Sequence, residues 1–236
     1  MTNQSHPEAN SPPLSDTQYQ NPIRRANMKW YHGTSKQNAE RILKEGVLKP
    51  GQESTYDVDI PRSEAVYIAD FDVANQYAIE RNGVVFEVAQ PNPKKLIPDE
   101  DDVYELLNDR GGELNTKGQN LTERVKALWL QKWNEDNTAY RESGYGEDQF
   151  PNYANFEQAW AAWGEIEFEG SAELAEQMKE LTDYIVKKDP KLAQAIITIA
   201  GKAAHLGPIK VVRQVKNAAK KDEPTKPAYF IIQPVL

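Results

Sequence analysis

Between residues 29 and 46, the spacing of apolar residues predicts a short strand followed by an amphipathic helix. Lys29–His32 is rich in aromatic residues and ends at a glycine, which is typical of a strand that runs into a turn. Over Lys36–Lys44 the apolar residues recur at helical spacing on one face. Thr34 or Ser35 can supply the side-chain oxygen that caps this helix, and Gly46 is a natural stop at its C-terminus.

The alternation of strand and helix patterns continues beyond a polar loop. Ala65–Ala69 and Val84–Ala89 are predicted to be strands, and Asp72–Arg81 between them is predicted to be a helix. Near the C-terminus, Ile209–Val215 alternates apolar and polar residues, and Tyr229–Ile232 is expected to be a closing strand. This order predicts an α+β fold whose sheet combines strands from both ends of the chain.

The middle of the chain, at about residues 103–200, is predicted to be a helical insertion in this core. The acidic run Asp99–Asp102 precedes it and is expected at the positive end of a helix dipole, with an oxygen-ligand metal site as the alternative. Further helices are expected over Ala172–Lys187 and Lys191–Ala204, separated by Pro190. Four of the five tryptophans lie in this part of the chain, and we interpret them as helix-packing core rather than as platforms for nucleobases: Trp129, Trp133, Trp160 and Trp163.

Composition narrows the class of protein. Residues 1–27 have few large apolar side chains and are expected to be a disordered tail, which leaves residues 28–236 for the folded domain. The chain has no cysteine and only three histidines, which excludes thiolate chemistry and argues against a zinc site, so we expect no metal. No apolar run approaches the roughly 20 residues that span a bilayer, and no signal sequence is evident, so we expect a soluble, cytoplasmic protein without a membrane partner.

Charge is distributed unevenly along the chain. The formal net charge is -8, which argues against a surface that coats nucleic acid. Asp99–Ile185 contains 21 acidic and 7 basic residues, whereas Lys202–Lys226 contains 7 basic and 2 acidic residues. The basic stretch can meet a phosphate backbone, although a solvated surface is the simpler interpretation.

The residues around His32 are the candidates for chemistry. A glycine at a strand end lets a ligand approach the backbone, and the neighbouring imidazole of His32 can form a directed hydrogen bond to a hydroxyl or carbonyl group. Tyr67 in the second strand and Tyr77 in the following helix can line a slot for a planar heterocycle. A core histidine bonded to backbone, and tyrosines that only pack, are the structural alternatives.

These residues carry a resemblance to a known family. Tyr31–Ser35, Ile42–Val47, Val66–Asp70 and Asn75–Ala78 resemble, in order and spacing, the diphtheria-toxin-like ADP-ribosyltransferases. That family includes the catalytic domains of poly-ADP-ribose polymerases, and its pattern is a histidine, a tyrosine and usually a glutamate. The resemblance covers about Lys29–Asp102 and implies an ADP-ribosyltransferase-like split β-sheet core that carries the helical insertion.

The resemblance implies roles for six residues and NAD as co-substrate. His32 would hold the ribose 2′-hydroxyl group of NAD, and Gly33 would bind the nicotinamide carboxamide through its backbone. Thr34 or Ser35 would reach the adenosine-side ribose, while Tyr67 and Tyr77 would enclose the nicotinamide ring. His32 and Tyr67 would be the catalytic pair of a glycosyltransferase that releases nicotinamide and transfers ADP-ribose to a nucleophile.

The sequence departs from the family at its third position. The expected strand, Ala203–Val211, contains no acidic residue. Glu87 belongs to the neighbourhood of the second motif, and three glutamates of the insertion are not placed to replace the missing one: Glu165, Glu167 and Glu169. His205 is a possible third element near the ribose, with a surface or capping role as the alternative.

Three functions follow from this comparison of residues. The leading one is an NAD-dependent mono-ADP-ribosyltransferase that modifies a macromolecule, either protein or nucleic acid. The alternative is a catalytically inactive module that keeps the fold and binds NAD or a partner. A third is an NAD-dependent RNA 2′-phosphotransferase, which calls for a set of phosphate-binding arginines that the scattered Arg41, Arg62 and Arg81 do not match.

Overall fold

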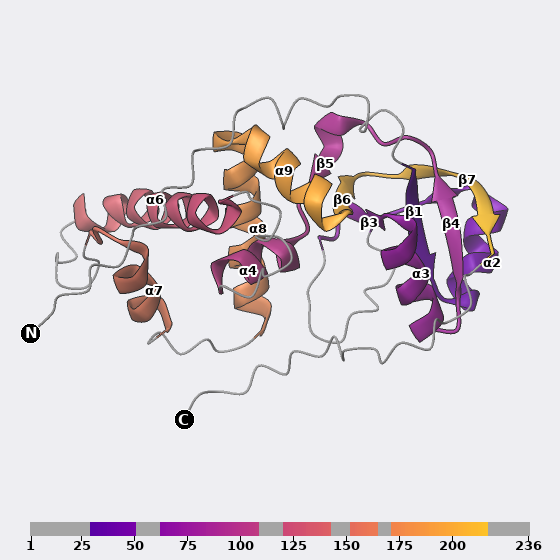
Figure 1. Cartoon of the computed structure of the whole chain (residues 1–236), viewed down its shortest axis with the longest axis horizontal. Helices are drawn as coiled ribbons and strands as arrows, with labels where there is room; N and C mark the ends of the chain where they lie inside the picture. The colour runs from indigo at the N-terminus through magenta and orange to yellow at the C-terminus, as the bar shows by residue number, and fades with distance from the viewer. Residues whose placement is uncertain (1–28, 51–61, 109–119, 143–151, 165–170, 217–236) are drawn as a thin grey trace, which may run out of the picture.

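A computed structural model describes residues 29–50, 62–108, 120–142, 152–164 and 171–216, and these residues form an α+β fold. The expected N-terminal tail, the closing strand Tyr229–Ile232 and the three glutamates considered at positions 165–169 lie outside the described residues. In Figure 1 the sheet, with helices α2 and α3, occupies one side of the molecule, and helices α4, α6, α7 and α8 occupy the other.

Within the described residues, seven strands form one antiparallel sheet in the order β2-β7-β4-β1-β3-β6-β5. The strands are β1 (Trp30–Thr34), β2 (Val47–Leu48), β3 (Ala65–Ala69), β4 (Val84–Val88), β5 (Leu96–Ile97), β6 (Lys202–Leu206) and β7 (Ile209–Val215). Because β7 pairs with β4 and β6 pairs with β3, the prediction that strands from both ends of the chain share one sheet is confirmed.

The pairing of β1 with its two neighbours is unequal. β1 pairs with β4 over its whole length, from Trp30 opposite Val88 to Thr34 opposite Val84. Its other neighbour, β3, shares a single register pair with it, Tyr31 opposite Ala69. β3 instead pairs along its whole length with β6. The sheet therefore consists of two well-paired parts that meet at β1 and β3.

Helices α2 (Lys36–Glu45) and α3 (Phe71–Glu80) follow the first and third strands. The side chain of Ser35 caps α2 by accepting a hydrogen bond from the backbone N–H of Asn38 (3.3 Å), and Gly46 ends the helix with φ of 69°. Both ends of α2 were predicted, because both depend on local residues. Asp70 caps α3 in the same way, by accepting from the N–H of Val73 at 3.0 Å.

The remaining helices lie between β5 and β6 in the chain. They are α4 (Glu100–Leu107), α6 (Leu121–Glu142), α7 (Phe156–Gly164), α8 (Ser171–Lys188) and α9 (Pro190–Ala200), and we call them the helical segment. A short 3-10 turn, η2 (Pro93–Lys95), precedes β5. The segment has a hydrophobic core of its own, in which Trp129 stacks on Trp133 and meets Phe156 and Trp160 edge to face. These contacts agree with the interpretation of Trp129, Trp133 and Trp160 as helix-packing residues, while the side chain of Trp163 lies outside the described part of the structure.

Two predictions of element boundaries were wrong. The helix expected over Lys191–Ala204 ends at Ala200, because Gly201 adopts a left-handed conformation with φ of 70° and the next residues pair with β3 as β6. The two short strands β2 and β5 lie in stretches for which no strand was predicted. Each of them contains two residues and depends on a partner far away in the sequence, which no local pattern shows.

The acidic run before the helical segment has the helix-terminal position that was predicted. Asp99 caps α4 by accepting a hydrogen bond from the N–H of Asp101 (3.1 Å), and residues 100–102 form the first turn. None of the described helices is both long and apolar enough to pass through a membrane.

Candidate functional site

His32 lies at the junction between β1 and β3. Its Nδ1 atom is 2.8 Å from the backbone carbonyl oxygen of Tyr67. A carbonyl oxygen only accepts, so Nδ1 donates this hydrogen bond and the neutral tautomer leaves Nε2 as an acceptor. Burial lowers the pKa of His32, the bond to Tyr67 acts against this effect, and the charge of Arg81 lowers the pKa further. The imidazole is therefore neutral at neutral pH.

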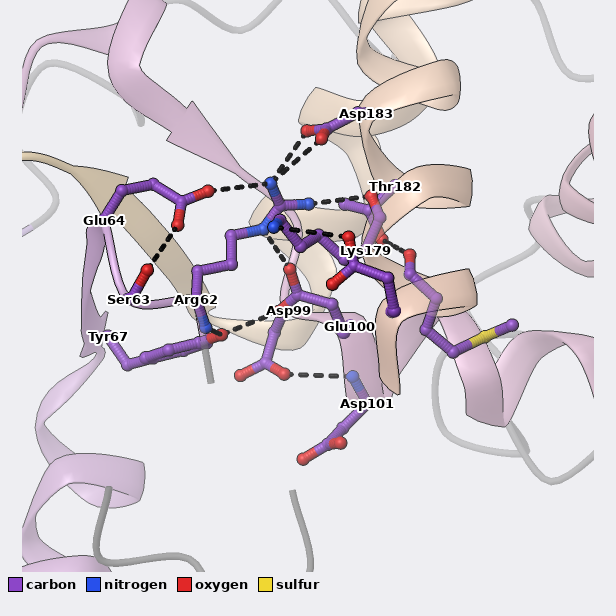
Figure 2. A network of polar contacts seen from close by, with 12 residues as sticks. Arg62, Ser63, Glu64, Tyr67, Asp99, Glu100, Asp101, Lys179, Thr182 and Asp183 are labelled. Carbon is purple, nitrogen blue, oxygen red and sulfur yellow. Dashed lines mark hydrogen bonds and ion pairs between the residues drawn. The ribbon is translucent and has the colours of Figure 1, made fainter. Parts of the chain in front are cut away.

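The tyrosine is held at its other end as well. The hydroxyl group of Tyr67 donates a hydrogen bond to Oε2 of Glu100 (2.9 Å) and accepts one from the backbone N–H of Arg62 (3.2 Å). Figure 2 shows the tyrosine ring beside this network. Burial raises the pKa of Tyr67, and the nearby Glu100 and Asp99 raise it further, so the phenol keeps its proton at neutral pH. The Tyr67 side chain is half-buried and packs beside Ala65, Ile97 and Ala204.

Arg62 is the centre of the network in Figure 2. Only 4% of its surface is exposed, and arginine is rarely buried without partners. Its Nε donates to Oε1 of Glu100, one terminal nitrogen lies 2.9 and 3.1 Å from the two oxygens of Asp183, and the other donates to the carbonyl of Lys179 at 2.9 Å. Burial raises the pKa of Glu100, while the charge of Arg62 acts in the opposite direction.

The glycine of the motif has a structural explanation. A Cβ atom at Gly33 would lie 2.1 Å from the carbonyl oxygen of Ala74 and 3.0 Å from the backbone N of Ala78. Only glycine therefore allows α3 to pack this closely on β1. The absence of a side chain at this position is explained by helix packing alone, and it is not by itself a sign of a ligand.

The two residues after Gly33 have structural roles too. Thr34 is buried, and its carbonyl oxygen is so close to Gly83 that a Cβ atom on that glycine would lie 1.7 Å away. Ser35 uses its hydroxyl oxygen as the cap of α2. A ligand would have to share that oxygen with the backbone N–H of Asn38.

Tyr77 lies on α3 beside a second group of charges. Arg81 sits over its ring, 5.8 Å from the centroid. Burial disfavours the charge of Lys202 on β6, yet Asp99, Asp102 and Tyr77 together raise the pKa of this lysine well above its ordinary value. Asp99 also acts on Tyr67. Asp99 thus acts on both Tyr67 and Lys202, and Lys202 is also influenced by Tyr77.

The side chains of His32 and Tyr67 begin on opposite faces of the sheet. Successive residues of a strand alternate between faces, and the Cβ position of Gly33 points at α3. His32 therefore shares the face of Trp30, which packs in the same cluster as Val66 and Ile68, the residues on either side of Tyr67. The two motif residues come together only through the hydrogen bond across the junction of β1 and β3.

His205 is buried in β6 rather than at the surface. Its cross-strand partners are Val66 and Leu96, and its Nδ1 lies 3.2 Å from the carbonyl oxygen of Gly207. Because β3 separates β6 from β1, His205 and His32 are not neighbours in the sheet. Glu87 is engaged by two cations, 3.2 Å from Lys29 and 2.7 Å from Arg213.

Sequence reasoning missed Arg62 and Glu100 as parts of this site. Arg62 was treated as one of three scattered arginines, and Glu100 as part of a helix-terminal acidic run. Arg62 and Glu100 are 38 positions apart in the sequence, and Arg62 and Asp183 are 121 positions apart. No local pattern connects positions so far apart, and only the fold brings them together.

The interpretation of the site depends on its own geometry, because no similar protein was found. Comparison of the chain with protein-family models, with curated proteins and with solved structures found no match. Among the residues that the structure describes, no group of three or more histidines and carboxylates is placed to hold a metal ion.

Proposed function

We propose that this chain is an NAD-dependent mono-ADP-ribosyltransferase that transfers ADP-ribose to a macromolecule and releases nicotinamide. The observation that carries the proposal is the 2.8 Å hydrogen bond from His32 to the carbonyl of Tyr67. It joins the histidine and tyrosine motifs at the one place where two adjacent strands share a single register pair. The motif residues are thus in contact although 35 positions separate them.

The state of His32 suits the binding of a sugar hydroxyl. With Nδ1 committed as a donor, Nε2 has a lone pair, and within the described residues it has no hydrogen-bond partner. A ribose hydroxyl can donate to this atom. Because burial keeps the imidazole neutral, it adds no positive charge beside a sugar carbon that becomes electron-poor when nicotinamide departs.

Tyr67 and Tyr77 can supply ring faces for the nicotinamide. The hydroxyl group of Tyr67 is already bonded as donor and as acceptor, so its ring stays in place when a ligand arrives. Tyr77 is carried by α3, which packs directly on Gly33. A ligand that touches both the Nε2 atom of His32 and the Tyr67 ring must enter where β1 and β3 separate, because these side chains begin on opposite faces of the sheet.

Chemistry at this site would rest on orientation. Loss of nicotinamide breaks the C–N glycosidic bond with its electron pair leaving on nitrogen, and a nucleophile of the target forms the new bond and gives up its proton. Holding the donor sugar and the departing ring in fixed positions contributes to the rate without a covalent role for the protein. The target is a macromolecule in this proposal, with protein and nucleic acid distinguished by experiment.

One observation favours the alternative, an inactive module that binds NAD or a partner. Neither β6 (Lys-Ala-Ala-His-Leu) nor β7 (Ile-Lys-Val-Val-Arg-Gln-Val) carries an acidic residue at the third position of the family pattern. Among the described carboxylates, Glu100 lies at Tyr67 but is bonded to that tyrosine and to Arg62. The experiment therefore measures NAD binding and transfer separately.

The test is incubation of the protein with radiolabelled NAD and a cell lysate, with and without nuclease. We expect label on a macromolecule, release of nicotinamide, and loss of both in His32→Ala and Tyr67→Ala. Tyr184→Ala, a half-buried tyrosine of α8 outside the site, is the matched control and should transfer label normally. Nuclease-sensitive label would identify nucleic acid as the acceptor. Binding of NAD without transfer or free nicotinamide would favour the inactive module, and no binding at all would refute the proposal.

A further inference from the structure

A closed ring of hydrogen bonds joins Tyr67, Glu100 and Arg62. The backbone N–H of Arg62 donates to the Tyr67 hydroxyl oxygen at 3.2 Å, and that hydroxyl donates to Oε2 of Glu100 at 2.9 Å. The third hydrogen bond of the ring runs from Nε of Arg62 to Oε1 of the same carboxylate. Each oxygen of Glu100 thus has a different partner, one in the proposed site and one in the guanidinium group.

This ring is fixed to the helical segment at two points. Glu100 is the first residue of α4. Arg62 is bound to α8 through both oxygens of Asp183 and through the carbonyl of Lys179 (Figure 2). Both Asp183 oxygens are contacted by one terminal nitrogen of Arg62, and the other terminal nitrogen donates to Lys179, so two nitrogens of the guanidinium group are fixed on α8 by hydrogen bonds from a charged donor. The position of the Tyr67 hydroxyl is therefore set by helices outside the sheet.

Tyr67 is consequently held at both ends. Its carbonyl oxygen accepts from His32, and its hydroxyl group is bonded to Glu100 and to the backbone of Arg62. These contacts restrict the orientation of the ring. Removing the carboxylate contact would take away one of the two bonds at the hydroxyl end, while the histidine contact stays in place.

We propose that Glu100, held by Arg62, is a positioning residue that fixes the ring of Tyr67, so that the helical segment sets the geometry of the site. This inference rests on the proposed function as far as NAD is concerned. The orientation of the tyrosine itself can be measured without any ligand, which keeps the two proposals separable.

The first variant is Glu100→Gln. Glutamine keeps the size of the side chain but replaces one carboxylate oxygen with an NH2 group, so it cannot accept at the two separate oxygen positions that Arg62 and Tyr67 use in Glu100. With 3-fluorotyrosine incorporated at position 67, we expect the ¹⁹F resonance of the variant to shift and to broaden relative to the wild type. We also expect kcat/KM for NAD to fall about tenfold, mainly through a higher KM, which is the size of effect that loss of a hydrogen bond to a charged group produces.

A double-mutant cycle separates positioning from a general structural effect. In a Tyr67→Phe background the hydroxyl contact is absent, so Glu100→Gln should change the KM for NAD by less than about twofold. The matched control is Glu135→Gln, which alters an exposed ion pair between α6 and Lys188 and should leave both the ¹⁹F signal and the kinetics unchanged. If Glu100→Gln does not fold, Asp183→Asn loosens the anchor of Arg62 at an exposed side chain and should shift the same resonance by a smaller amount.

The outcomes are distinct for the two proposals. An unchanged ¹⁹F resonance in folded Glu100→Gln, or in Asp183→Asn when the first variant does not fold, overturns the positioning role whatever the protein does with NAD. A shifted resonance in a protein that binds no NAD supports positioning and refutes the proposed function. A shifted resonance with unchanged NAD kinetics overturns the claim that the helical segment sets the geometry of the site.

Discussion

Among the described carboxylates, Asp102 has a pKa that is strongly raised. One of its oxygens lies 3.1 Å from Nζ of Lys202, while the other is buried without a hydrogen-bond partner among the described residues. Burial raises the pKa of Asp102 to about 7, against the attraction of Lys202 and with further repulsion from Asp99 and Glu105. Lys202 carries one positive charge and lies beside two carboxylates, those of Asp99 and Asp102. One positive charge does not offset both of them, so Asp102 takes up a proton.

This arrangement predicts an unusual pH dependence of stability. The pKa of Asp102 is about 7 in the folded protein and 3.8 ordinarily, so between these values the folded state binds a proton that the unfolded chain releases. The stabilisation is fully present below pH 3.8, decreases as the pH rises from 3.8 to about 7 with a slope of at most about 1.4 kcal/mol per pH unit, and is absent above this range. Urea unfolding of the wild type and of Asp102→Asn can be measured between about pH 5.5 and about pH 8.5, a range that includes this pKa. We expect the pH-dependent contribution in the wild type only. Equal slopes in the two proteins would contradict the assignment.

The candidate site could be predicted from the sequence only in part. His32, Gly33, Tyr67 and Tyr77 were found because their types and order form a pattern within one short region. That pattern did not show that the His32 ring binds the Tyr67 backbone, since side-chain direction depends on how two strands pair. Nor did it reveal the partners of the tyrosine hydroxyl, because the carboxylate and the guanidinium are brought there by helices.

At the scale of elements, the ends of helices were predicted where a capping residue acts locally. Ser35 and Gly46 bound α2, and Asp99 begins α4. The same reasoning was wrong for α9, because the apolar pattern continues through Gly201 into a strand and only pairing with β3 makes it extended. Local chemistry decides where a helix begins, whereas long-range pairing decides which of two apolar runs becomes a strand.

Packing of α3 on β1 is an element-scale contact that a single methyl group can disrupt. In Gly33→Ala the new Cβ would lie 2.1 Å from backbone atoms of α3, and backbone cannot move aside as a flexible side chain can. We expect the free energy of unfolding in urea to fall by about 3 kcal/mol, at the upper end of overpacking effects. Gly46→Ala has no atom within 4 Å of its Cβ and only a positive φ of 69°, so it should cost about 1 kcal/mol. A smaller loss at Gly33 than at Gly46 would show that α3 does not pack as closely as described.

At the scale of the whole molecule, two hydrophobic cores are joined through one helix. The helical segment surrounds one core, and the sheet with α2 forms another that includes Trp30 and Phe86. α9 contributes to both, since Ile196 packs in the first and its neighbour Ile197 in the second. Arg62 adds a polar connection from the sheet to α8. Because α9 contributes side chains to both cores, its unfolding would expose apolar surface in both. The unfolding of the two parts is therefore coupled.

Unfolding should therefore be a single transition, and a cavity in either core should lower the stability of both. With 5-fluorotryptophan, the ¹⁹F signal of Trp30 reports on the sheet, and those of Trp129, Trp133 and Trp160 report on the helical segment. We expect Ile196→Ala to lower the free energy of unfolding by about 2–5 kcal/mol, with the same urea midpoint at every tryptophan. Leu43→Ala, at a side chain that is 55% exposed, is the control and should change it by less than about 0.5 kcal/mol. A wild-type midpoint at Trp30 in Ile196→Ala would mean that the sheet folds without the helical segment, which would contradict a single transition.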